Sequence, residues 1–262
     1  MTTLSIKKLV QRDRAILAGG LIVTVAASWL YLLHGAGMEM QSMDAMPMSG
    51  MPWSLPYAAL MLAMWAVMMM AMMLPSAAPM LLFYASLARR REHSAGMAGT
   101  WLFTLGYIAV WIGFSIAATG LQWSLDLASL FSPAMQVTNV ILAAAVLIGA
   151  GIYQWTPLKQ TCLRHCRSPL DFVLTHWREG LSGAFQMGLR HGVYCLGCCW
   201  MLMLLLFVGG LMNLAWIAGI AAVVLIEKTA TAGHWIGRMM GGVLIVWGLA
   251  TLGRGLICST RL

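Results

Sequence analysis

The chain has 262 residues, of which 61% are hydrophobic and only 9% are charged, and its formal net charge is +8. A mean hydropathy of +0.81 excludes an ordinary soluble domain and indicates a polytopic membrane protein in contact with the lipid bilayer. The basic residues lie in short segments between apolar runs, where they act as topology signals, so no nucleic-acid partner is expected. We predict an all-α fold, a transmembrane helix bundle of about seven spans.

Composition divides the chain into four parts. Residues 1–14 are basic and are predicted to lie in the cytoplasm, which places the N-terminus inside. Residues 15–33 are apolar and long enough to cross a hydrocarbon core of roughly 30 Å as a first transmembrane helix. Residues 34–55 are predicted to form an exterior loop, and residues 56–262 the rest of the transmembrane bundle.

The exterior loop is rich in methionine. Thioether sulfur suits Cu(I) and does not have to lose a proton in order to bind. Glycine, serine and proline in the loop exclude a regular helix, so the loop predicts a flexible site for soft-metal capture. A low-complexity linker or a membrane-surface contact is the alternative. The candidate ligands are Met38, Met40, Met43, Met46, Met48 and Met51.

The second span, at about 57–84, continues this pattern into the membrane. It places four methionines within an arc of roughly 80° on a helix, namely Met61, Met64, Met68 and Met72. Pro75 and Pro79 should kink or break the inner end of the span. The methionines either extend a metal route, with Met68 and Met72 as ligands, or pack against apolar neighbours.

The stretch Gln186–Met203 places one histidine and three cysteines in an otherwise apolar run. At roughly 100° per residue, His191, Cys195 and Cys198 fall within an arc of about 60° on a helix, with Cys199 at its edge. Imidazole and thiolate favour Cu(I), with Zn(II) as the alternative ion. In the other interpretation, the cysteines are small packing residues and the histidine bonds to a neighbouring helix.

A second donor group precedes this stretch in a basic segment, 156–181, which is expected in the cytoplasm. Cys162, His165 and Cys166 are spaced i, i+3 and i+4, so a helix would place all three on one turn. We predict them as further metal ligands. The alternative is a reduced cysteine pair that binds no metal.

Glu227 and Lys228 end the apolar run 214–226. A carboxylate near a membrane is a candidate for a proton-coupled role. The simpler expectation is a charge at the membrane border, paired with Lys228 or with Arg238. The last span is then expected over 241–256.

These features predict an integral membrane protein that binds a soft metal, most simply Cu(I), and holds, relays or transports it. Such a protein would meet a metal-donor or metal-acceptor protein. The alternative function is a dithiol/disulfide oxidoreductase that uses Cys195 and Cys198 with a quinone. We recognise no nucleotide loop, catalytic dyad or paired-carboxylate pattern, so a binding role is favoured over an enzymatic one.

Four blocks of the sequence also carry a family resemblance: MMMAMMLP at Met68–Pro75 after Trp65, YQWTPLK at Tyr153–Lys159 ahead of Cys162 and Cys166, HGVYCLGCCW at His191–Trp200, and the Glu227–Lys228 pair. With these blocks, the segment from about Tyr57 to Gly253 resembles the bacterial family of predicted metal-binding integral membrane proteins. The resemblance implies a single all-helical domain in the bacterial inner membrane, with a metal site at the Cys and Met blocks. It supplies no substrate or reaction.

Overall fold

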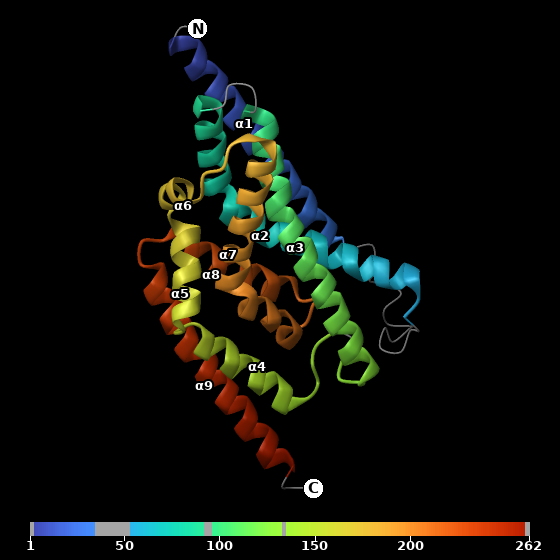
Figure 1. Cartoon of the computed structure of the whole chain (residues 1–262). Helices are drawn as coiled ribbons and strands as arrows, with labels where there is room; N and C mark the ends of the chain where they lie inside the picture. Colours follow the sequence, from blue (N-terminus) through green and yellow to red (C-terminus); the bar gives the residue numbers. More distant parts are fainter. Residues whose placement is uncertain (1–2, 35–52, 92–95, 133–134, 260–262) are drawn as a thin grey trace.

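The structure is a computed structural model that describes residues 3–34, 53–91, 96–132 and 135–259. The six candidate ligands of the exterior loop, from Met38 to Met51, lie outside the described residues. The described part of the chain confirms the predicted all-α fold (Figure 1). Its helices are α1 (Thr3–Leu33), α2 (Leu55–Arg91), α3 (Gly96–Leu127), α4 (Val140–Tyr153), α5 (Pro157–Arg167), α6 (Pro169–His176), α7 (Gly180–Gly209), α8 (Leu214–Thr229) and α9 (Gly233–Ser259).

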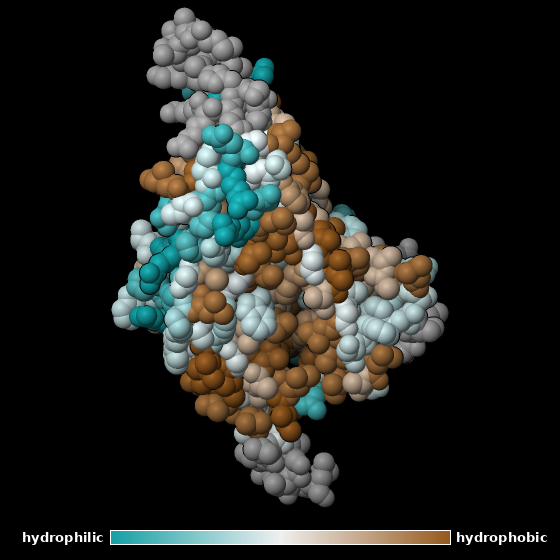
Figure 2. Space-filling view, viewed as in Figure 1, coloured by the Kyte–Doolittle hydropathy of each residue, from teal (hydrophilic) through white to brown (hydrophobic). Residues whose placement is uncertain are grey.

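The helix lengths indicate a multi-pass membrane protein. Among the described residues, α1, α2, α3, α7 and α9 contain segments long and apolar enough to cross a membrane, and α4 with α5 forms a sixth such span, bent by 63°. With the 16-residue helix α8, which is about 24 Å long, the number of segments approaches the predicted seven. The face in Figure 2 carries hydrophobic residues across its middle and lower parts and hydrophilic residues at its upper left.

Polar residues fix several helix ends. Asn139, Thr156 and Asn213 each accept a hydrogen bond from backbone N–H groups in the first turn of α4, α5 and α8, which satisfies groups that a helix start leaves unpaired. Gly210 ends α7 with a φ of 90°, a conformation that favours glycine because a Cβ would be strained there. A short turn therefore joins α7 to α8.

Helix α7 packs most extensively against α3, and it also contacts α4 and α5. A Cβ added at Gly188 would collide with the backbone carbonyl of Phe103, and one added at Gly106 would collide with that of Phe185. Glycine at both crossing positions lets the two backbones touch, as small residues do at transmembrane helix interfaces. This close contact between α3 and α7 fixes the rotation of α7 about its own axis. It therefore sets the direction in which the predicted metal donors of α7 point.

Helix α2 runs from Leu55 to Arg91 without a break, although it contains Pro75 and Pro79. Figure 1 shows that it changes direction between its first and second halves. The prolines remove backbone donors from the helix, and neighbouring helices support the bend. The predicted proline effect is therefore a bend and not a break.

Candidate metal centre

The donor stripe predicted on α7 is buried. The side chain of His191 is 2% exposed, and those of Cys195, Cys198 and Cys199 are each 1% exposed. All three cysteines are free thiols. The fixed helical period places them on one inward face, beside the bend of α2 and against α5 and α8.

Helix α5 brings a fourth thiol to this face. The Sγ atom of Cys166 lies 4.0 Å from that of Cys198, and its thiol also interacts with Cys195. Cys162 lies against Gly197, where a Cβ would be only 2.7 Å from the Cys162 Sγ atom. Both cysteines expected in a cytoplasmic segment therefore lie against α7, and Cys166 joins the three cysteines of α7 in one cluster.

His165, the third metal donor predicted on α5, lies apart from this cluster. The ring of His165 stacks on Tyr194, with 4.3 Å between ring centroids, and lies 5.9 Å from the ring of His176. The i, i+3, i+4 spacing does form one helical turn, but its three donors do not face one common point. His165 belongs to a separate aromatic group.

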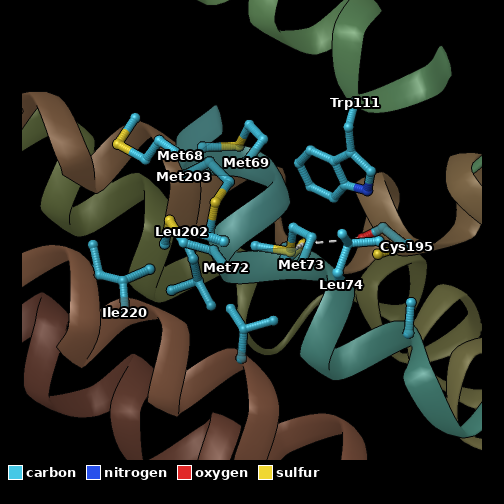
Figure 3. Packing of buried hydrophobic residues seen from close by; sticks show 14 of the residues in the cluster. Met68, Met69, Met72, Met73, Leu74, Trp111, Cys195, Leu202, Met203 and Ile220 are labelled. Atoms are coloured by element: carbon cyan, nitrogen blue, oxygen red, sulfur yellow. Dashed lines mark hydrogen bonds between the residues drawn. The ribbon is translucent and has the colours of Figure 1, made fainter. Parts of the chain in front are cut away.

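Helix α2 contributes a thioether to the thiol cluster. The Sδ atom of Met73 lies 4.0 Å from the Sγ atom of Cys199. Figure 3 shows Met73 on the side of Cys195, whereas Met68 and Met72 lie toward a group formed by Met203, Leu202 and Ile220. The predicted stripe of Met61, Met64, Met68 and Met72 is buried, but the methionine beside the cysteines is its neighbour, Met73.

A lysine completes the centre. The Nζ atom of Lys228 donates to the Sγ atom of Cys195 at 2.9 Å and to the Oγ atom of Ser76 at 3.0 Å. The hydroxyl of Tyr107 lies 3.1 Å from the same sulfur. A buried ammonium needs an anionic partner, and a deprotonated Cys195 would supply it at the observed distance. Neither Lys228 nor Tyr107 was predicted as part of this site, although a polar group inside an apolar span was a usable signal.

Glu227 has a different partner from the one expected. Its Oε2 atom accepts from the Nζ atom of Lys159 at 2.6 Å, and Lys159 also donates to the side chain of Gln154. Both charged side chains are buried, at 1% and 2% exposure. The prediction of a border charge paired with Lys228 or Arg238 is wrong, because α5 inserts its lysine between α4 and α8. Arg238 lies over the ring of Trp235 instead.

The thiols are not gathered around one point. Within the described parts of the chain, no group of three or more His, Cys, Asp or Glu side chains is arranged to hold a metal ion. Cys198 and Cys199 both donate to the backbone carbonyl of Cys195, at 3.1 and 3.0 Å. His191 sits among the rings of Phe103, Tyr107 and Phe172, and its buried Nδ1 atom has no hydrogen-bond partner in the described structure.

The possible metal-ligand atoms of this cluster are nevertheless all sulfur. Four thiols, one thioether and a neighbouring ammonium meet where α2, α5, α7 and α8 come together, and soft thiolate and thioether ligands favour Cu(I), Zn(II) or an iron–sulfur centre over hard cations such as Mg²⁺. A helical membrane protein with a buried soft-donor cluster is the class that this fold and this centre define.

Comparison with known proteins places the chain within a family. The family model described as PpoB2, copper chaperone, matches residues 62–251, well over half of the chain. The protein therefore belongs to this copper chaperone family, and the matched segment contains every residue that contributes to the cluster. No curated protein and no solved structure matches the chain.

Proposed function

We propose that this protein is a copper chaperone of the bacterial inner membrane, which binds Cu(I) inside the helix bundle and passes it to an acceptor protein. The observation that carries the proposal is the contact among Cys166, Cys195, Cys198 and Cys199, with Met73 beside them. The family membership supports copper as the cargo. Copper is here the substrate that the protein carries.

Charge balance supports a monovalent ion. Cu(I) held by two thiolates carries one net negative charge, and the ammonium of Lys228 beside Cys195 neutralises it. A buried ionic group is tolerated when its charge is balanced and hydrogen-bonded. Zn(II) on the same two thiolates would leave one net positive charge with Lys228 in place, so a zinc site would need a third thiolate.

The thiols have to rotate to form the site. Because Cys198 and Cys199 are bonded to the carbonyl of Cys195, their sulfur atoms must leave that acceptor to reach a common ion. Two ligand bonds to sulfur of about 2.3 Å each reach up to about 4.6 Å, which is more than the 4.0 Å between the sulfur atoms of Cys166 and Cys198. An ion can therefore bridge these two sulfur atoms with little movement of α5.

The test is copper loading of the detergent-purified protein followed by elemental analysis. We expect on the order of one Cu(I) per chain and near-zero copper in the variant Cys195→Ser, Cys198→Ser, Cys199→Ser. The matched control is Cys258→Ser, which changes a cysteine of α9 and should bind as the original protein does. Equal copper in the triple variant and the original protein would overturn the proposed site.

A second candidate function is dithiol/disulfide exchange. The observation that favours it is the 4.0 Å distance between the sulfur atoms of Cys166 and Cys198, which makes this pair, and not Cys195 with Cys198, the better candidate for a disulfide. Thiol counting by mass shift, with and without reductant, separates the two functions. A copper-holding site should give the same thiol count in both samples, whereas an exchange protein should lose two thiols without reductant.

A further inference from the structure

A second group of metal donors lies next to the thiol cluster, at the start of α7. Two histidines, from α6 and α7, contact the ring of Phe172, and a third, from α5, contacts one of them. His176 stacks on Phe172 at 5.0 Å, His191 meets it edge-on at 5.4 Å, and His165 lies 5.9 Å from His176. Because His191 also belongs to the donor stripe of α7, the part of this group that is separate from the stripe is the pair His165 and His176.

Two of these histidines are prepared to bind an ion. The Nδ1 atom of His176 lies 2.7 Å from the Oγ1 atom of Thr175 and 3.2 Å from the carbonyl oxygen of Phe172. Because the Thr175 hydroxyl donates to the carbonyl of Asp171, the ring N–H is the donor at Nδ1, which leaves the lone pair on Nε2, as in many metal-binding histidines. The buried Nδ1 atom of His165 has no hydrogen-bond partner among the described residues. Two imidazoles on one ion, with bonds of about 2.0 Å, have ring centres roughly 6 Å apart, close to the observed separation.

A surface cavity is lined by one member of this histidine pair, His176. The cavity has a volume of about 280 Å³. Its lining includes His176 and the soft donor Met187, together with Arg178 and Arg190. The ring of His165 lies 5.9 Å from that of His176, and His165 is the direct sequence neighbour of Cys166, which contacts Cys198. The histidine pair thus links the cavity to the thiols.

We propose that His165 and His176 form an entry site for Cu(I), which receives the ion in the cavity and passes it to Cys166. The inference rests on the proposed function and adds a second site and a direction of loading to it. Each step is a ligand exchange in which copper remains Cu(I). At entry, the thiolate of the donor complex leaves the copper ion as an imidazole nitrogen binds to it. In the second step, the imidazole nitrogen leaves the ion as the Cys166 sulfur binds to it, and the proton of the Cys166 thiol goes to solvent.

The charge around the cavity selects the form in which copper arrives. Arg178 and Arg190 repel a bare cation but attract an anionic complex. The Arg178 guanidinium is held by the side chain of Gln186, which is neutral and leaves its charge uncompensated. A small anionic Cu(I)–thiolate complex, such as Cu(I) bound to glutathione, therefore has the chemistry that this cavity fits.

The experiment measures the rate of copper transfer from Cu(I)–glutathione to the purified full-length protein, together with the final copper content. In His176→Phe, which keeps an aromatic ring against Phe172, we expect loading to be slower by about tenfold, with the final copper content unchanged. The matched control is His234→Phe on α9, another partly exposed histidine, which should load at the original rate.

The outcomes separate the two proposals. A His176→Phe variant that loads as fast as the original protein overturns the entry site and leaves the thiol site intact. An original protein that takes up no copper overturns the proposed function itself. If His176→Phe fails to fold, His165→Phe, which keeps the stacking on Tyr194, tests the same step and is expected to show the same slower loading.

Discussion

Two lysines are buried in the bundle, and their partners differ in kind. Lys159 meets the carboxylate of Glu227, a hard oxygen anion. Lys228 meets the sulfur of Cys195 and the hydroxyl of Ser76. A carboxylate with an ammonium partner gains little from a soft metal, whereas a thiolate is a preferred Cu(I) ligand. The pair of Lys159 and Glu227 is therefore a fixed part of the fold. In the pair of Lys228 and Cys195, the cysteine can also bind an incoming metal ion.

The first pair, Lys159 with Glu227, is tested by removing its carboxylate. Glu227→Gln leaves the ammonium of Lys159 buried without an anion, and breaking a buried pair in this way costs about 3–5 kcal/mol. We expect a large fall in the unfolding temperature in detergent, with the copper content of the folded fraction unchanged. The double variant with Lys159→Met removes both charges and should recover most of the loss. Unchanged stability in the single variant would contradict a structural ion pair.

The opposite change removes the ammonium that neighbours the thiols. Lys228→Met keeps the length of the side chain but not its charge, so a bis-thiolate Cu(I) site retains one uncompensated negative charge. We expect Cu(I) affinity to fall by about tenfold, roughly 1.4 kcal/mol, with a smaller loss of stability than in Glu227→Gln, because the Cys195 thiolate can take up a proton. Competition with a Cu(I) chelator measures the affinity. A larger loss of stability than of affinity would make Lys228 a structural residue.

The smallest expected effect concerns the thioether. Met73→Leu keeps volume and apolarity but removes the sulfur that lies 4.0 Å from Cys199. We expect a few-fold weaker Cu(I) binding, since thioether is a weaker ligand than thiolate. Met69→Leu is the matched control, because Met69 is equally buried and has no assigned contact with the thiols. Equal affinities in the two variants would reduce Met73 to a packing residue.

Helical periodicity explains why the α7 part of the site is readable from sequence. A spacing of three and four residues fixes one face of a helix, and the apolar surroundings require that this face be buried, so the stripe from His191 to Cys199 follows from local information. The all-α fold follows in the same way from the length of the apolar runs. Neither inference depends on how distant segments pack.

The rest of the site depends on tertiary contacts that periodicity does not contain. Cys166 reaches Cys198 because α5 turns back along α7 after the bend from α4, and because Gly197 has no side chain to obstruct Cys162. Met73 replaces the predicted Met72 because one residue changes the facing direction by roughly 100°, and the bend in α2 adds to that change. The partner of Lys228 is set by the same packing.

The backbone carbonyl that accepts from both Cys198 and Cys199 has a consequence for how fast a metal site can form. Both thiols are held by the carbonyl of Cys195 within their own helix, so assembling a metal site requires rotation about side-chain bonds and no separation of helices. Collective movement of whole helices takes microseconds to milliseconds, and the site can be assembled without it. If the protein carries copper as proposed, the thiols can therefore capture the ion without waiting for the helices to separate.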